Sequence, residues 1–162
     1  MKCKLTPELS SGDWKDFCSR FHFASTDLPH IQAIYTALLP LVECYAYYSL
    51  DQDLDEVSLS HYAYGFVTLG TGLDELSELY LNHEQIQEAY IVDCISLVLL
   101  SKAYEAFAHV VENQTNLHLA ELSFLGDTYS LDLLPQIYEH LAPDTIRLTE
   151  GLMLRPLKTA TL

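Results

Sequence analysis

Three polar residues interrupt an otherwise apolar stretch in the second half of the chain: Asp93, Ser96 and Glu105. Burying a carboxylate without a partner is costly, so we expect Asp93 to accept hydrogen bonds from backbone or hydroxyl donors. Glu105 lies three residues after Lys102 and four before His109, a spacing that brings side chains together on a helix. These residues can form an ionic pair or triad at the surface. The simpler interpretation is that Glu105 is exposed and paired with Lys102 alone.

Motifs for catalysis, metal binding and phosphate binding are missing from the sequence. The seven histidines are scattered, with none in an HExxH motif or beside a cysteine pair, so we expect no metal site. The four cysteines form no CxxC pair, and Cys44 and Cys94 lie in apolar runs, which predicts buried thiols. The glycines of GTGLDE precede carboxylates that would repel a phosphate at a helix start. We therefore expect a strand-to-helix turn there, and no catalytic residue.

Charge and hydropathy restrict the class of partner. The 162 residues include 23 acidic and 8 basic side chains, a formal net charge of -15. Such a surface repels phosphate backbones and anionic lipids, which excludes nucleic acids and membrane surfaces, and it suits a cationic ligand or a basic protein face. Solubility alone would also explain the negative net charge.

The start lacks a secretory apolar region, and the longest apolar run, residues 89–100, is interrupted by Asp93 and is too short to span a bilayer. We expect one cytoplasmic domain over residues 1–162.

Helices are expected where apolar residues recur every three to four positions. The expected helices cover residues 6–20, 28–39, 73–81, 84–112 and 131–141. Proline should end the second helix near Leu39 and break the last near Pro135. The middle of residues 84–112 is apolar nearly all round, which predicts a long, buried central helix.

Strands are expected at residues 45–50 and 62–69, which are rich in aromatic and β-branched side chains and are separated by the acidic connection 51–60. A further strand is expected at residues 117–124. The strands come in separated pairs rather than alternating with helices. This order favours an α+β fold with an antiparallel sheet.

The C-terminal stretch TIRLTEGLMLRP predicts a hairpin. A two-residue turn at residues 150–151 would mix polar and apolar side chains on one face. A three-residue loop at residues 149–151 pairs Leu148 with Leu152, buries a clean apolar face and puts Gly151 in the left-handed conformation that such loops require. We expect the second register.

Several segments occur in the order found in a known family. TLGTG ends a strand before an amphipathic helix, the long helix carries YEAFA at residues 104–108, and the chain closes with IRLTEGLMLRPLKTATL. Through these segments, residues 66–162 resemble the activation domain of vitamin B12-dependent methionine synthase. The resemblance implies a bent antiparallel sheet with helices grouped around it. It also implies a domain that binds S-adenosylmethionine and docks on a cobalamin domain, where it enables reductive remethylation of cobalamin oxidised to the cob(II) state.

Cofactor-binding residues follow from the resemblance by position. Glu105 matches the helix glutamate that meets the cofactor in the family, and an acid suits a sulfonium or ammonium cation. Gly126 matches the glycine of the family's glycine-tyrosine loop in one alignment. Glu150, Thr159 and Thr161 match the C-terminal segment, with the threonines standing where the family has two serines.

The cofactor-binding arginine of the family is not retained. Its position is held by Glu121 or Leu122, depending on the alignment, so the carboxylate of S-adenosylmethionine loses its bidentate partner. The resemblance predicts an accessory protein of methionine biosynthesis that docks on a corrinoid methyltransferase, meets cobalamin only through that partner, and binds S-adenosylmethionine weakly. The alternatives are an S-adenosylmethionine-dependent enzyme, and a structural protein, such as a homodimer, with a degenerate ligand site.

Overall fold

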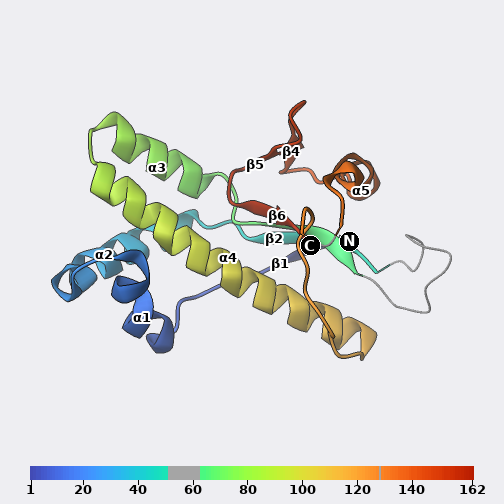
Figure 1. Cartoon of the computed structure of the whole chain (residues 1–162), viewed down its shortest axis with the longest axis horizontal. Coiled ribbons are helices and arrows are strands. Elements are labelled where there is room, and N and C mark those ends of the chain that lie inside the picture. The colour runs from blue at the N-terminus through green and yellow to red at the C-terminus, as the bar shows by residue number, and fades with distance from the viewer. Residues whose placement is uncertain (51–62, 128) are drawn as a thin grey trace.

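The computed structural model describes residues 1–50, 63–127 and 129–162, and an antiparallel sheet forms its centre (Figure 1). Four strands lie in the order β1-β2-β3-β6. Their bounds are Lys2–Lys4 for β1, Tyr45–Ser49 for β2, Tyr64–Thr68 for β3 and Thr159–Thr161 for β6. A separate antiparallel pair joins β4 (Arg147–Leu148) to β5 (Leu154–Arg155). The fold is α+β, as the order of the elements predicted. The expected connection 51–60 lies outside the described residues.

The helices lie where the periodicity of the sequence predicted them, except that the first begins at Ser11 and not at residue 6, because Ser10 caps it. They are α1 (Ser11–Phe21), α2 (Leu28–Leu38), α3 (Gly72–Asn82), α4 (Ile86–Thr115) and α5 (Leu134–Leu141). A 3-10 turn at Leu39–Leu41, which contains Pro40, follows α2, and Pro135 lies in the first turn of α5. Both prolines therefore mark helix boundaries, as predicted, because proline fits only the first turn of a helix.

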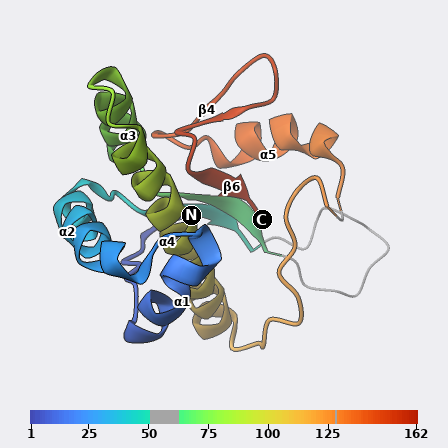
Figure 2. The ribbon, with the colours of Figure 1, turned by 60° about the vertical axis from the view of Figure 1, so that its left-hand side comes forward.

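The two faces of the sheet are covered by different layers. Ala46, Tyr48 and Val67 pack with residues of α1, α2, α3 and α4, whereas Tyr47 and Phe66 pack with α5 and the hairpin. Figure 2 shows α5 and β4 on one side of the sheet and α1 and α4 on the other. Because successive side chains of a strand point to opposite faces, each strand contributes to both layers. We refer to these as the α4 face and the α5 face.

The prediction of a long, buried central helix is confirmed by α4. Ile91, Ile95 and Leu99 are fully buried, and they face the sheet along one side of the helix. The thiols of Cys44 and Cys94 are buried in the same cluster, as expected. Among the helices of the described residues, none has the length and apolar character needed to cross a bilayer.

The two outer strands come from the two ends of the chain, and the sequence pattern did not reveal them. β1 is short and contains Lys2 and Lys4, so it has no apolar alternation. β6 was not expected as a strand, since its threonines were noted only through the family resemblance. Each is a strand because β2 or β3 offers it a free edge: Cys3 pairs with Ala46, and Ala160 pairs with Val67.

The strand expected at residues 117–124 is wrong. That segment is irregular, and its contact with the sheet edge comes just after it, where Leu125 N donates to Thr161 O at 3.1 Å. A short segment that contains apolar residues does not form a strand by itself, because a strand also needs a neighbouring edge along its length.

The predicted register of the hairpin is also wrong. Leu148 pairs with Leu154, so the connection runs over residues 149–153, and the left-handed residue is Leu152 with φ 57° rather than Gly151. Thr149 organises this longer turn: its Oγ1 accepts from Met153 N at 3.1 Å, and its carbonyl accepts from Leu152 N at 3.0 Å. The side-chain hydrogen bond offsets the cost of a longer loop, and the apolar pair still faces the core.

Candidate functional site

A groove of about 340 Å³ opens on the α5 face beside β6. Its walls come from the segment after α4, from the start of α5, from the β4–β5 hairpin and from the C-terminal strand. The lining residues are Phe124, Leu125, Leu131, Leu134, Leu152, Met153, Leu154, Leu157, Thr159, Ala160 and Thr161. None of these is charged. We call this feature the C-terminal groove.

The outer wall of the C-terminal groove is an exposed apolar surface. Leu131, Leu152, Met153 and Leu157 each keep between 39 % and 51 % of their surface in contact with solvent. Contiguous apolar side chains at the surface of a monomer mark interaction sites more often than isolated ones do. The groove can therefore accept apolar side chains, and it offers no charge to a charged ligand.

The two threonines of β6 lie in the groove, but their hydroxyl groups are already engaged or covered. Thr159 Oγ1 lies 2.8 Å from Thr68 Oγ1 on the neighbouring strand, and Thr161 is only 7 % exposed. Antiparallel pairing of β6 with β3 fixes both positions. The expectation that these hydroxyls serve a ligand therefore has little support from their geometry.

The segment leading into β6 is held by side chains from distant elements. Leu157 N donates to Asp74 Oδ2 at 2.6 Å, and Lys158 Nζ donates to Asp93 Oδ1 at 2.8 Å. The second contact corrects the expected partner of Asp93: its donor is an ammonium, and its side chain is half exposed rather than buried. The other oxygen of Asp74, Oδ1, is buried and lacks a hydrogen-bond partner among the described residues.

Gly126 and Glu150 border the C-terminal groove without lining it. A Cβ at Gly126, which has φ 102°, would lie 3.5 Å from the side chain of Leu131 in the groove wall. Glu150 is exposed in the hairpin turn, next to residues that line the groove. The structure thus brings four of the five expected cofactor residues to one region, Gly126, Glu150, Thr159 and Thr161.

Glu105 does not lie in that group. Lys102 Nζ lies 3.2 Å from Glu105 Oε2 and 3.3 Å from Asp13 Oδ1 of α1. Because Lys102 contacts both carboxylates, Glu105 lies on the side of α4 that faces α1. The carboxylate of Glu105 raises the pKa of Lys102 through this contact. The side chain of Glu105 is 59 % exposed. The simpler interpretation, an exposed helix residue paired with Lys102, is confirmed.

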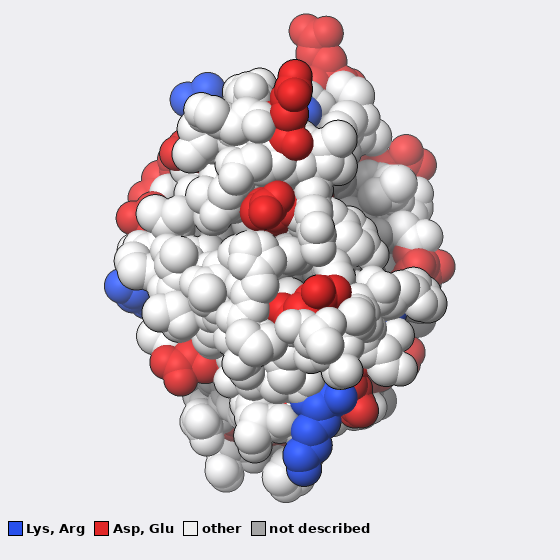
Figure 3. Space-filling view, turned by 90° about the vertical axis from the view of Figure 1, so that its left-hand side faces the viewer, with Lys and Arg blue, Asp and Glu red and all other residues white. Residues whose placement is uncertain are grey.

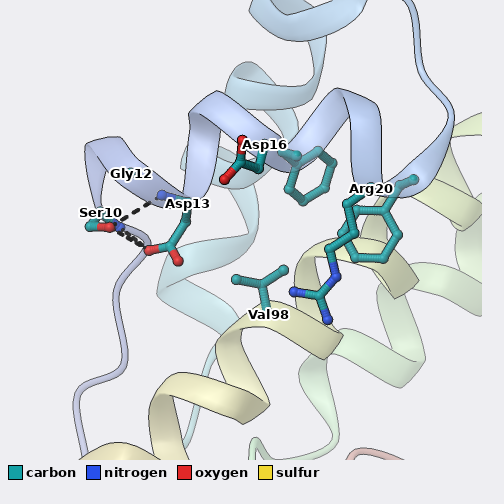
Figure 4. A pocket seen from close by; sticks show the side chains of 8 residues that line it. Ser10, Gly12, Asp13, Asp16, Arg20 and Val98 are labelled. Atoms are coloured by element: carbon teal, nitrogen blue, oxygen red, sulfur yellow. Dashed lines mark hydrogen bonds between the residues drawn. The ribbon is translucent and has the colours of Figure 1, made fainter.

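A second hollow, of about 350 Å³, lies between α1 and α4, where Phe17 and Val98 form apolar walls. Figure 4 shows Asp13 and Asp16 on one side and the guanidinium of Arg20 reaching over Val98 on the other. Asp13 belongs to the capping box of α1: the hydroxyl of Ser10 donates to it and lowers its pKa. One of the two carboxylates that line the hollow therefore serves the helix start.

Comparison with protein-family models finds no match, and comparison with curated proteins finds none either. Within residues 1–50, 63–127 and 129–162, no three His, Cys, Asp or Glu side chains gather in a set that could hold a metal.

Sequence reasoning missed most of the C-terminal groove. Its walls include Leu152, Met153 and Leu157, which a correct hairpin register would have placed outside the core. One signal was present: four large apolar residues, Leu152, Met153, Leu154 and Leu157, occur between Gly151 and Lys158. Exposed apolar residues in a loop are a recognisable mark of an interaction surface.

Proposed function

We propose that this chain is a cytoplasmic accessory protein that docks on a cobalamin-binding methyltransferase and assists the reductive methylation of its cobalamin. The proposal rests on the ordered resemblance of residues 66–162 to the activation domain of vitamin B12-dependent methionine synthase. Docking takes place through the C-terminal groove, and the cobalamin belongs to the partner.

The observation that carries this proposal is the apolar, uncharged lining of the C-terminal groove. A protein surface with protruding apolar side chains complements such a lining, since the centre of an interface is depleted of charge. S-adenosylmethionine carries a carboxylate, an ammonium and a sulfonium group, and no side chain in the described lining carries an opposite charge for any of them.

The arrangement of the matching segments also supports the proposal. TLGTG ends β3 and begins α3, YEAFA lies on α4, and the closing segment forms β6. In the fold, β6 pairs with β3, and the segment before it is bonded to Asp74 of α3 and Asp93 of α4. TLGTG and the closing segment, which are far apart in the sequence and both carry the resemblance, are therefore neighbours in space.

Analytical ultracentrifugation with the organism's own cobalamin-binding methyltransferase tests the proposal. We expect a 1:1 complex at micromolar concentrations. The variant Met153→Asp places a charge in the groove wall and should weaken docking by at least about tenfold, which is about 1.4 kcal/mol. Leu117→Asp is the matched control: Leu117 is 47 % exposed and Met153 50 %, but Leu117 is not a groove residue.

Absence of association in every cobalt oxidation state would refute the proposal.

Calorimetry with S-adenosylmethionine tests the alternative that the chain is an S-adenosylmethionine-dependent enzyme. We expect no binding tighter than about 10 micromolar, roughly -7 kcal/mol. Tighter binding that Glu105→Ala weakens would replace docking with cofactor binding as the function of the chain.

A further inference from the structure

Exposed apolar side chains also gather at the opposite end of the molecule, where α3 turns into α4. Leu79 and Leu81 in the last turn of α3 are 52 % and 53 % exposed, and Ile86 and Tyr90 in the first turns of α4 are 69 % and 47 % exposed. The C-terminal groove contains none of these residues. This surface, which we call the α3–α4 end, is therefore independent of the proposed docking groove.

Hydrogen bonds fix the backbone of the α3–α4 end. Gln85 N donates to Tyr80 O at 2.9 Å, Glu84 N donates to Leu81 O at 3.0 Å, and Glu84 is in a left-handed conformation with φ 59°. The hydroxyl of Tyr90 donates to Phe21 O at 3.4 Å. A preorganised surface loses little conformational entropy when a partner binds. The exposed apolar side chains are thus presented on a rigid support.

Along the chain, the charged residues of the α3–α4 end are all acidic. No lysine or arginine occurs between Arg20 and Lys102, whereas Glu75, Glu78 and Glu84 lie on α3 or in the turn. Figure 3, which views the side of the molecule that carries the α3–α4 turn and α2, shows carboxylates scattered among uncharged atoms in the middle of the face, with Lys or Arg side chains on its lower part and at its edges.

The exposed apolar side chains and the nearby carboxylates together indicate which kind of partner could bind here. A second copy of the chain would bring the same carboxylates against it, and its net charge of -15 opposes such pairing. Nucleic acid and anionic lipid are repelled for the same reason. A protein segment with basic side chains on both sides of an apolar stripe matches both features, because the stripe covers Leu81 and Ile86 while the basic groups meet the carboxylates.

We propose that the α3–α4 end is a docking surface for a basic amphipathic helix of a partner protein. The inference does not depend on cobalamin or on the C-terminal groove. Binding buries Leu81 and Ile86 against the apolar stripe of that helix, and Glu78 and Glu84 pair with its lysines or arginines. The charges accelerate association, and the apolar contacts slow dissociation.

Fluorescence anisotropy with a labelled synthetic peptide tests this inference. The peptide spans about five helical turns and carries lysines on both sides of a leucine stripe; a second peptide has glutamate in place of lysine. We expect the lysine peptide to bind at micromolar concentrations and the glutamate peptide not to bind. Raising the salt concentration should weaken binding by about tenfold, since exposed charges are screened.

Paired variants separate a specific surface from diffuse attraction to an acidic protein. The double substitution Glu78→Gln, Glu84→Gln should weaken peptide binding by at least about fivefold, whereas the control Glu121→Gln, Glu139→Gln removes two exposed carboxylates elsewhere and should change it by less than about twofold. Leu81→Ser with Ile86→Ser should weaken binding without changing its salt dependence. Equal losses in the two glutamine variants, or no binding of the lysine peptide to the wild type, would overturn the inference.

Discussion

The two faces of the central sheet hold the domain together in different ways. The α4 face is a large apolar cluster in which α4 packs on the sheet together with α1, α2 and α3. The α5 face has a much smaller cluster, and polar contacts supplement it: Tyr138 donates to Ile146 O at 2.9 Å, and Tyr47 and Lys2 both donate to Asp144. The C-terminal groove lies on this second face. Stability is thus concentrated on one face, and the candidate interaction surface lies where local stability is lower.

The largest contrast should appear when one buried side chain is truncated on each face. Leu99→Ala on the α4 face should cost about 3–5 kcal/mol, because a fully buried site surrounded by a helix and a sheet cannot collapse. Ile137→Ala on the α5 face should cost about 2–3 kcal/mol, since Ile137 lies one turn from Leu134 in the groove wall, where side chains can move into the space. Urea denaturation measures both free energies of unfolding. Equal losses would show that the faces are equally rigid.

A pair of glycines extends the comparison to close backbone contacts. A Cβ at Gly72, where α3 begins beside the connection after α2, would lie 2.5 Å from Leu41 O, so Gly72→Ala should destabilise the domain by about 1–3 kcal/mol. Gly151 in the hairpin has only Thr149 Oγ1 nearby, at 4.0 Å. Gly151→Ala should therefore change stability by less than about 0.5 kcal/mol. Thermal melting of both variants checks this order, and a large effect at Gly151 would contradict the observed hairpin.

The free energy of unfolding should depend on a buried thiol of the α4 face at alkaline pH. Burial raises the pKa of the Cys44 thiol from 9.0 to about 12, and nearby Cys3 adds to the effect. Above pH 9 the unfolded chain loses this proton while the folded chain keeps it, so stability should fall as the pH rises from 9 to 12, by at most about 1.4 kcal/mol per pH unit. Cys44→Ala should flatten that fall in urea titrations, whereas Cys18→Ala, which removes a half-buried thiol, should not. A wild-type stability that stays constant up to pH 11 would argue against this assignment.

The smallest effect is expected on the α5 face at acid pH. The hydrogen bond from the Tyr47 hydroxyl, followed by the contact with the Lys2 ammonium, lowers the pKa of Asp144 below its ordinary 3.8. The unfolded chain therefore binds a proton first, and the stabilisation by Asp144 is present above about pH 4 and lost as the pH falls through the folded pKa. Asp144→Asn should lower the melting temperature slightly at pH 7 and reduce its further drop toward pH 3. An unchanged drop would show that Asp144 does not contribute.

Sequence periodicity was sufficient for the helices and for β2 and β3, because their residues repeat a local pattern that one face of the core requires. It was not sufficient for β1, which has two lysines in three positions, or for residues 117–124, which contain apolar residues without a strand beside them. The predicted register of the hairpin was wrong for a related reason. Its register depended on the Thr149 side chain, which hydrogen-bonds within the turn, and not on the apolar pattern alone.

The candidate site was predicted in part. The resemblance led to Thr159, Thr161, Gly126 and Glu150, which lie in or beside one groove, and it also led to Glu105, which faces α1 instead. The need for a partner at Asp93 was correctly expected, but the identity of that partner was not. Lys158 follows Asp93 by 65 positions, and no local pattern connects them.

By itself, the sequence determined the acidic composition, the approximate positions of the helices, the buried helix α4 and the α+β class, because each depends on composition or on side chains within a few turns of one another. Only the tertiary structure decided which edges β1 and β6 occupy, which side of α4 Glu105 faces, and that Leu131, Met153 and Leu157 line one groove. These features require segments far apart in the chain to meet. Their positions follow from how two apolar faces of one sheet are covered, which is a property of the packed domain and not of any short stretch.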